Sequence, residues 1–300
     1  MARLAAVTGA TGFVGPHLVA ALARHGWTLR LLIRRWTPLP SLPGVEADIV
    51  WGDLADETSL KALVDGADAV VHAAGLIKAR RPAEFAAVNR DGTARLSALA
   101  PNVPFLLLSS LAAREPQLSP YAASKRAAEE AIARRSGAWL ALRAPAVYGP
   151  GDRETLAYFK MAKLGFALQP DRPEARLSLI HVEDLAEALA LVLDRPPSGV
   201  LEIDDGHPGG YSHDDMAKAA AAAFGRRVRP IRVGQGLMTA IASANRLRPG
   251  PQILTPEKVR ELFHSDWTAR RSGLKGFAAR YNLREGFDHT ILWYRSHHWL

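Results

Sequence analysis

Short apolar runs alternate with amphipathic segments through the first half of the chain. The runs have the length and branched or leucine-rich composition of buried strands, and the segments between them repeat apolar residues at helical spacing. Such alternation predicts a parallel sheet with helices on both faces. The predicted strands cover residues 5–8, 28–33, 47–51, 69–72, 105–108 and 139–143, and the predicted helices begin near residue 16 and cover 58–64, 85–99 and 121–135.

Beyond residue 149 this regular alternation loosens. The pattern there predicts helices over 152–164, 181–193, 237–247 and 256–263, a strand over 199–203 and a turn over 206–210. We therefore expect an α/β protein with a doubly wound parallel sheet in residues 1–150, joined by a returning segment around 175–205. A smaller C-terminal lobe, mainly 151–300, is expected to bind the substrate.

Three glycines spaced three residues apart follow the first predicted strand. Gly9 permits a tight turn, Gly12 permits close approach to a pyrophosphate, and Gly15 permits close packing of helix on strand. The helix behind them offers unpaired N–H groups to phosphates. Pro16 is tolerated in the first helical turn, where no N–H is required. The motif predicts a dinucleotide-binding Rossmann domain, with a ligand-free glycine turn as the alternative.

Composition narrows the chemistry. The 300 residues are 48% hydrophobic and include no cysteine, which excludes disulfides, thiolate zinc sites and cysteine nucleophiles. The net charge of +8 is concentrated near the end, because residues 225–300 hold 14 Lys and Arg against 5 Asp and Glu. An anionic substrate or a peripheral membrane contact would suit this lobe, and a solvated arginine-rich surface is the plainer interpretation. No nucleic-acid module is visible. With no signal peptide or spanning segment predicted, we expect a cytoplasmic protein.

Tyr121 and Lys125 stand one helical turn apart, which places them on one face of a predicted helix. A lysine ammonium favours a neighbouring phenolate, so the tyrosine is a candidate general acid and base. Ser109 and Ser110 end a predicted strand, where open α/β sheets bind ligands, and a serine hydroxyl there is a candidate to bind a substrate oxygen.

These motifs, in this order, resemble the extended short-chain dehydrogenases/reductases. That group contains sugar-nucleotide epimerases, dihydroflavonol reductases and 3β-hydroxysteroid dehydrogenases. The resemblance covers essentially the whole chain, including Gly92 and Thr93, Arg143, the stretch 181–186 and the tail 290–300. It implies that Ser110, Tyr121 and Lys125 are catalytic, with no metal. It implies cofactor contacts from Gly9, Thr11, Gly12, Phe13, Val14, Asp53, Leu54, Ala73, Ala74, Gly75, Asn89, Ser109, Tyr121, Lys125, Pro145 and Val147.

One departure from the family bears on the cofactor. Many relatives that use NAD carry an acidic residue after the second strand, and this chain has Arg34 and Arg35 there. A guanidinium suits a 2′-phosphate, so we expect NADP in preference to NAD. Solvent-facing arginines are the alternative. The segment 277–280 lacks a proline that relatives often have, which bears only on that loop.

The expected activity is hydride transfer between nicotinamide and a secondary alcohol or ketone. A nucleotide-sugar epimerase or dehydratase would use the same transfer transiently, and a non-catalytic cofactor-binding subunit is a third reading. The apolar stripe over 237–247 favours a hydrophobic ketone or alcohol, with core packing as its alternative. Arg226, Arg227, Arg229 and Arg232 are candidates for holding the diphosphate of a sugar nucleotide. A homodimer is an open expectation.

Two polar clusters are given structural interpretations. His213, Asp214 and Asp215 suit a helix start better than a metal site. Glu183 and Asp184 suit first-turn acids that complement a helix dipole better than a catalytic pair.

Overall fold

The structure is a computed structural model that describes residues 3–38, 42–194, 198–245, 254–270 and 274–300. It consists of two compact units. The first unit is formed by Met1–Ala144, Leu185–Glu202 and Gly273–Phe277, and the second by Pro145–Asp184, Ile203–Ser272 and Ala278–Leu300. Among the described residues, no helix combines the length and the apolar character needed to cross a bilayer.

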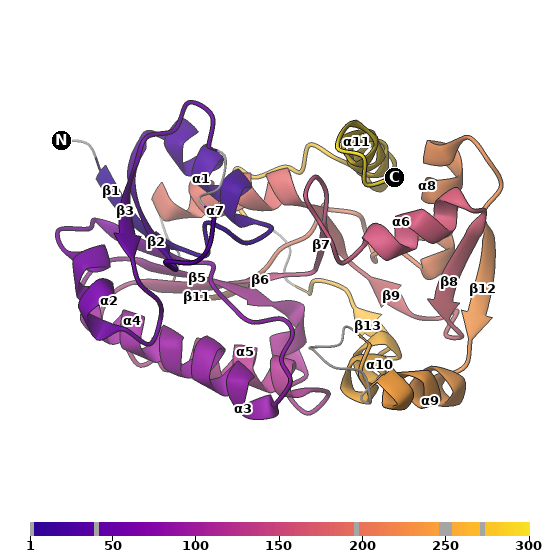
Figure 1. Cartoon of the computed structure of the whole chain (residues 1–300), viewed down its shortest axis with the longest axis horizontal. Coiled ribbons are helices and arrows are strands. Elements are labelled where there is room, and N and C mark those ends of the chain that lie inside the picture. The colour runs from indigo at the N-terminus through magenta and orange to yellow at the C-terminus, as the bar shows by residue number, and fades with distance from the viewer. Residues whose placement is uncertain (1–2, 39–41, 195–197, 246–253, 271–273) are drawn as a thin grey trace. The chain divides into compact units, whose positions relative to one another are not determined.

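A sheet of seven parallel strands forms the centre of the first unit (Figure 1). Its order is β11-β6-β5-β4-β1-β2-β3. The chain adds β2 and β3 on one side of β1 and then β4, β5, β6 and β11 on the other, so the direction of strand addition reverses between β1 and β4. All six strands expected before residue 144 are confirmed, as is the returning strand after 198. The bounds are β1 Arg3–Thr8, β2 Trp27–Ile33, β3 Ala47–Trp51, β4 Ala69–His72, β5 Phe105–Ser110, β6 Trp139–Ala144 and β11 Gly199–Glu202.

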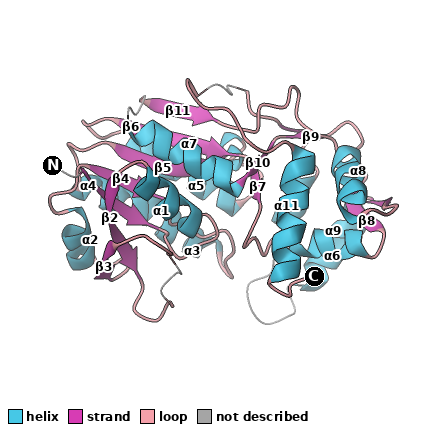
Figure 2. Ribbon diagram, turned by 90° about the horizontal axis from the view of Figure 1, so that it is seen from above, coloured by secondary structure: helices cyan, strands magenta, loops and turns pink. Residues whose placement is uncertain are grey.

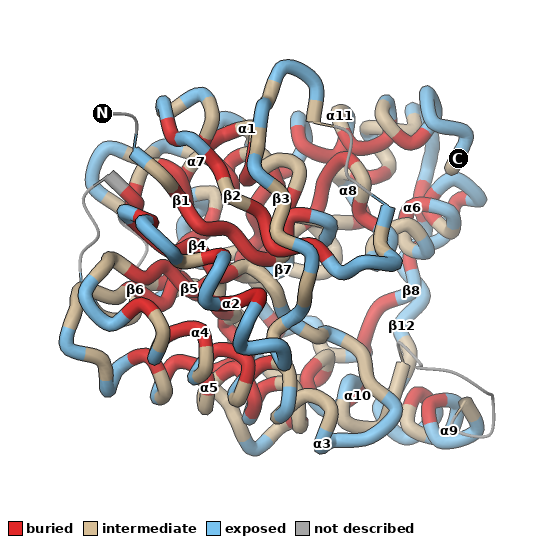
Figure 3. The backbone as a smooth tube through the Cα atoms, turned by 60° about the vertical axis from the view of Figure 1, so that its left-hand side comes forward, coloured by how far each residue is buried: buried red, intermediate tan, exposed pale blue. Residues whose placement is uncertain are grey.

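Helices cover both faces of this sheet, with α1 and α7 on one side and α2, α4 and α5 on the other (Figures 1 and 2). Most residues of β1, β2, β4 and β5 are buried, as the tube coloured by burial shows (Figure 3), and apolar side chains from these strands belong to the core beneath the helices. The bounds are α1 Gly15–Arg24, α2 Glu57–Val64, α3 Pro82–Phe85, α4 Thr93–Leu99, α5 Pro120–Ile132 and α7 Val182–Asp194, with a 3₁₀ turn, η2, over Leu111–Arg114.

The helix predicted over 85–99 is confirmed, and its first half is a π-helix rather than an α-helix. Residues Ala86–Gly92, labelled η1, form a π-helix between α3 and α4. A Cβ at Gly92 would lie only 3.0 Å from atoms of Leu54, so the wider turn brings backbone close to the loop after β3. The π segment also carries the buried Asn89.

The second unit pairs short parallel strands two at a time, and these pairs were not predicted. They are β7 Ala146–Tyr148 with β10 Leu179–His181, β8 Phe166–Pro170 with β12 Arg229–Val233, and β9 Arg176–Leu177 with β13 Asp266–Trp267. Its helices are α6 Leu156–Lys163, α8 His213–Phe224, α9 Gln235–Asn245, α10 Pro256–Leu262 and α11 Leu283–Ser296.

An aromatic cluster forms the core of the second unit, where Phe159 and Phe287 lie 4.9 Å apart between ring centroids. Helix α6 begins later than predicted because the Asp152 carboxylate accepts the N–H groups of Glu154 and Thr155 in a turn. Helix α9 confirms the start of the segment predicted over 237–247, and the last two residues of that segment lie outside the described residues.

The direction reversal between β1 and β4 brings two backbone turns unusually close. Gly9 has φ +83°, and a Cβ there would lie 2.5 Å from Ala74 N and 2.6 Å from the Ala73 carbonyl carbon. Gly26 has φ +78° with open space where its Cβ would be. Both glycines have a left-handed backbone conformation, and only Gly9 is crowded by neighbouring atoms.

We therefore expect Gly9→Ala to destabilise the protein more than Gly26→Ala. Gly26→Ala should lower the free energy of unfolding by about 1–2 kcal/mol through left-handed strain alone. Gly9→Ala should lose roughly 1–3 kcal/mol more, because the backbone must move to admit the methyl group. Urea denaturation of both variants measures the difference, and equal losses would contradict the crowding argument.

Candidate active site

Helix α1 begins directly after the glycine turn. Gly12 N–H donates to Gly9 O at 3.0 Å, and Gly15 N–H donates to Gly12 O at 3.1 Å. Helix α1 has no capping side chain and no acid in its first turn. Its first N–H groups and positive dipole end therefore fit a diphosphate. Around this turn Thr11 and Gly12 are exposed, and Phe13 and Val14 are half-buried.

The end of β4 lies against this turn and against the helix that carries Lys125. Thr8 O accepts the N–H of Ala73 at 3.2 Å. A Cβ on Gly75 would lie 3.4 Å from Asn89 Oδ1 and 3.9 Å from Lys125 Nζ. The structure thus brings the glycine turn, the Ala73–Gly75 segment, Asn89 and Lys125 into one neighbourhood at the carboxyl edge of the sheet.

Arg34, Arg35 and Asp53 are exposed on loops that leave the same edge. Arg34 follows β2 directly, and Gly52 N–H donates to Ile33 O at 3.0 Å, which ties the loop after β3 to the end of β2. Leu54 O accepts a hydrogen bond from the Arg95 guanidinium at 2.5 Å. The backbone that carries Arg34 and Arg35 therefore leaves the sheet beside the loop that contains Asp53.

Lys125 is buried on α5, and its ammonium donates to Leu108 O at 2.7 Å. Burial lowers the pKa of Lys125 to about 8, although the charge of Glu129 opposes that shift. Tyr121, one turn earlier, is half-buried and packs edge-on against Phe85 with ring centroids 6.1 Å apart. An ammonium held at the end of β5, one turn from a phenol, suits acid–base chemistry there.

The two serines at the end of β5 make different hydrogen bonds. Ser110 Oγ accepts the N–H of Ala112 at 3.2 Å, which leaves its hydroxyl hydrogen available to a ligand oxygen. Ser109 is buried, and its hydroxyl donates to Glu129 at 2.5 Å. Ser110 stays a candidate to bind a substrate oxygen, whereas the Ser109 side chain is engaged inside the unit.

A buried ion cluster, not anticipated from the sequence, fixes α5 to the sheet. Arg143 of β6 donates two hydrogen bonds to Glu129, at 2.9 and 2.7 Å, and one to Glu202 of β11 at 3.2 Å. Glu202 also pairs with Arg114 at 3.4 Å. The Arg143 guanidinium thus holds Glu129, one turn beyond Lys125.

A second network runs from the glycine turn through His72. The single hydroxyl hydrogen of Thr93 is donated to Asn89 O at 2.5 Å, so its oxygen must accept from His72 Nε2–H at 2.9 Å. His72 Nδ1 is then bare and accepts from the Thr8 hydroxyl at 2.6 Å. Thr8 Oγ1 in turn accepts Ala74 N–H at 3.2 Å. Every donor in this chain points the same way.

Asn89 continues the connection to α5. Its side-chain amide donates to Leu76 O and to Ser124 Oγ, at 3.0 and 2.9 Å, and its carbonyl accepts Leu76 N–H at 2.7 Å. The Ser124 hydroxyl donates to Tyr121 O at 2.7 Å. The expected cofactor contact Asn89 thus also orients the backbone of Tyr121.

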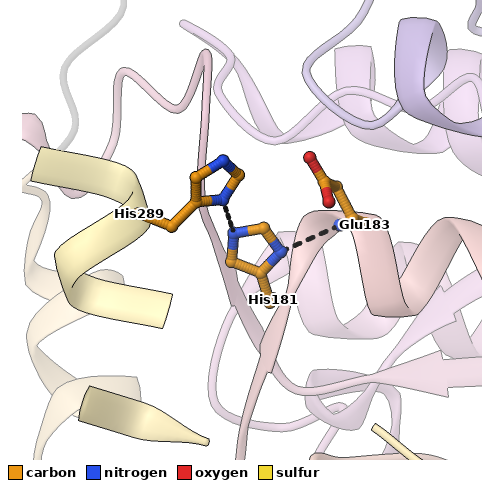
Figure 4. A group of neighbouring side chains, drawn as sticks. All are labelled: His181, Glu183 and His289. Atoms are coloured by element: carbon orange, nitrogen blue, oxygen red, sulfur yellow. Dashed lines mark hydrogen bonds between the residues drawn. The ribbon is translucent and has the colours of Figure 1, made fainter. Parts of the chain in front are cut away.

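The second unit contains Pro145 and Val147, the latter on β7 in register with Ile180 of β10. It also brings His181, Glu183 and His289 together (Figure 4). Glu183 N–H donates to His181 Nδ1 at 3.2 Å, and the two rings are joined at 3.2 Å between His181 Nε2 and His289 Nδ1. A ligating histidine normally donates from its second nitrogen. His181 accepts there, so we interpret the group as a hydrogen-bonded network.

The acids at the start of α7 hold the chain segment before α11. Asp184 accepts the N–H groups of Arg280 and Tyr281 at 3.1 and 3.0 Å, and Glu183 accepts the Tyr281 hydroxyl at 3.0 Å and pairs with Arg280. Both are first-turn acids, as expected, with this added role. The cluster near 213 also starts a helix, although the cap is Ser212, which forms a capping box with Asp215.

Some of these residues left a signal in the sequence. The Asn282 and Glu285 spacing is that of a capping box and could have located α11. The supporting contacts of His72, Glu129 and Arg143 left no local signal, because their partners lie elsewhere along the chain.

Comparison with known proteins agrees with the fold of the first unit. A model of the NAD dependent epimerase/dehydratase family matches residues 5–203. A Caulobacter vibrioides protein named ceramide reductase is 42% identical over 98% of this chain and 95% of that protein. A Stigmatella aurantiaca ketoreductase of a farnesylated dihydroquinoline oxide is 25% identical over 94% of each chain. The solved structure of MoeE5 in complex with UDP-glucose and NAD is 25% identical, with a TM-score of 0.74 over 98% of this chain and 99% of that one.

The His72 network makes a direct spectroscopic prediction. Burial, aided by the charge of Lys125, lowers the pKa of His72 to about 3. We expect ¹H–¹⁵N spectra of the imidazoles to show His72 neutral, with its hydrogen on Nε2, from pH 8 to about pH 5. His72→Gln identifies the signal, and an Nδ1–H ring or a titration near pH 6.5 would contradict the network.

The same shift predicts an acid-dependent contribution to stability. An unfolded histidine binds a proton near pH 6.5, and folded His72 does so only near pH 3. Between pH 6.5 and pH 3 the unfolded state therefore binds more protons than the folded state. The contribution of His72 to the free energy of unfolding falls by about 1.4 kcal/mol for each pH unit below 6.5. The stability advantage of the wild type over His72→Gln should narrow accordingly between pH 7 and pH 4.5.

Proposed function

We propose that this chain, which belongs to the NAD dependent epimerase/dehydratase family, is an NADP-dependent reductase acting on a ketone of a long-chain lipid. The family and the relatives make it an enzyme that uses a nicotinamide cofactor. The preference for NADP, the roles of individual residues and the lipid substrate are our proposal beyond that.

The observation that carries the proposal is the setting of Lys125. Its ammonium is buried and fixed on Leu108 O, at the edge where the glycine turn and the Ala73–Gly75 segment meet. A bound NADPH supplies the hydride for a carbonyl carbon. The Ser110 hydroxyl binds the carbonyl oxygen, and the Tyr121 hydroxyl donates its proton to that oxygen, giving an alcohol. The Lys125 charge favours the phenolate that remains.

The residues at the cofactor edge fit NADP. The uncapped start of α1 suits the diphosphate, and Arg34 and Arg35 offer two cations where a 2′-phosphate would be recognised. Gly75 lies beside Asn89 and Lys125, and Ala73 and Ala74 contact the glycine turn.

The substrate class rests on the relatives. The relative named ceramide reductase matches nearly the whole chain at 42% identity, and the ketoreductase relative acts on a farnesylated compound. We therefore propose the ketone of an N-acylated long-chain amino alcohol, the oxidised form of a ceramide. The reaction is ketone plus NADPH plus a proton, giving the secondary alcohol plus NADP⁺.

A nucleotide sugar is the alternative substrate, favoured by the likeness to MoeE5 with UDP-glucose. Two of the four arginines considered for its diphosphate are otherwise engaged. Arg232 pairs with Asp214 at 2.9 Å, and Arg226 donates to Lys163 O at 2.5 Å. This arrangement favours the lipid ketone.

We expect NADPH oxidation with the ketone of an N-acylated long-chain amino alcohol and none with UDP-glucose. Isotope-labelled NADPH should place its label on the carbinol carbon, read by mass spectrometry. Turnover of a UDP-sugar, with the cofactor regenerated and no reaction of the lipid ketone, would establish the epimerase alternative.

Tyr121→Phe should lower kcat by at least about 10²–10³-fold and leave NADPH affinity within a few-fold, because the ring shape stays and the transferable proton is lost. Tyr158→Phe is a matched control, since it removes a phenol from the second unit. Equal turnover by Tyr121→Phe and the wild type would exclude the proposed role.

Replacing Arg34 and Arg35 together with alanine should weaken NADPH binding by about 1.5–3 kcal/mol and spare NADH, because charged hydrogen bonds to the 2′-phosphate are lost. Arg134→Ala, another exposed arginine of the first unit, is the control. Calorimetry measures both cofactors, and tighter binding of NADH than NADPH by the wild type would overturn the preference.

A further inference from the structure

The outer face of the β8–β12 pair exposes large apolar side chains. Leu168 is 51% exposed and stands in register with Ile231, which is 39% exposed. Phe166, two residues before Leu168, is 40% exposed. The alternate residues Ala167 and Gln169 are buried on the opposite side. Because side chains two apart on a strand share a face, these three apolar groups form one surface, which we call the β8–β12 face.

Cations border this face. Phe166 is in register with Arg229, and Arg227 precedes that strand. Both arginines are exposed, and neither has an ion pair within the described ranges. Leu164 and Lys163, just before β8, are exposed as well. No Asp or Glu stands between Asp215 and Glu257, so the segment that forms β12 carries only positive charge.

The edge of the pair is protected against another strand. Among the described residues β12 pairs only with β8, and Pro230 with its neighbouring arginines interrupts the open side of β12. Proline and charge on an edge strand prevent addition of a further strand. The side chains of the face itself remain exposed, which suits a broad, non-directional contact.

We propose that the β8–β12 face docks on the surface of an anionic lipid bilayer. Its apolar side chains would enter the boundary between headgroups and acyl chains while Arg227 and Arg229 contact the phosphates. The choice of a bilayer rests in part on the proposed lipid substrate, since an enzyme acting on such a lipid must meet it where it is dissolved. Figure 1 shows β8, β12 and α6 side by side in the second unit.

Vesicle sedimentation tests this without any turnover. We expect the full chain to sediment with vesicles of equal parts phosphatidylglycerol and phosphatidylcholine, to stay in solution with phosphatidylcholine alone, and to be released by raised ionic strength. Arg227→Gln with Arg229→Gln should weaken binding roughly 25-fold, about fivefold for each charge. Leu168→Thr with Ile231→Thr should weaken it about tenfold.

Control variants remove exposed charged or apolar side chains elsewhere in the chain. Arg134→Gln with Arg284→Gln removes two exposed charges, and Leu292→Gln removes an apolar side chain that is 66% exposed. Both should bind vesicles like the wild type. Equal binding by the face variants and the wild type, or no binding by the wild type, would overturn the proposal. A lipid-free dimer that the face variants abolish would assign the face to a second copy and overturn it too.

A water-soluble, short-chain analogue of the ketone separates the two proposals. Face variants that reduce it like the wild type but no longer sediment with vesicles support the docking surface. Vesicle binding without reduction of any ketone would support the docking surface and refute the proposed function. Reduction of the ketone by a wild type that does not bind vesicles would support the proposed function and refute the docking surface.

Discussion

The bidentate pair between Arg143 and Glu129 fixes the helix on which the proposed chemistry depends. Glu129 lies one turn beyond Lys125 and two turns beyond Tyr121, so anchoring it to β6 sets the rotation of α5 about its axis. Arg143 also reaches Glu202 on β11, so one guanidinium links a helix with two strands. Removing one partner from a buried pair destabilises by about 3–5 kcal/mol, because the other charge stays buried. The arrangement therefore gives α5 little freedom to rotate.

Much of the first unit could be predicted because its signals are local. Apolar runs of strand length, the Gly9–Gly15 spacing and the Tyr121–Lys125 spacing are all contained in short stretches, and every strand inferred from them is present. The supports of the site are not local. His72 meets Thr8 and Thr93, and Arg143 meets Glu129 and Glu202, only after the sheet has formed. A buried histidine and a strand arginine have no periodicity of their own.

The second unit was harder for a related reason. Its strands β9 and β13 have two residues each, and β7 and β10 have three. Segments so short show no alternation, and their pairings join distant parts of the chain. The basic character of this unit was evident from composition. Composition alone could not show that Arg232 is neutralised by Asp214 while Arg227 and Arg229 border an apolar face.

The one-way order of hydrogen bonds around His72 has a consequence for proton supply. From Ala74 N–H through Thr8, His72 and Thr93, each group donates toward Asn89 O, where the chain ends on a backbone carbonyl. Passing a proton along it would require the imidazole to exchange tautomers and both hydroxyls to turn. This network therefore does not relay protons to the site, and in the proposed reaction the proton that Tyr121 donates is replaced from the solvent side.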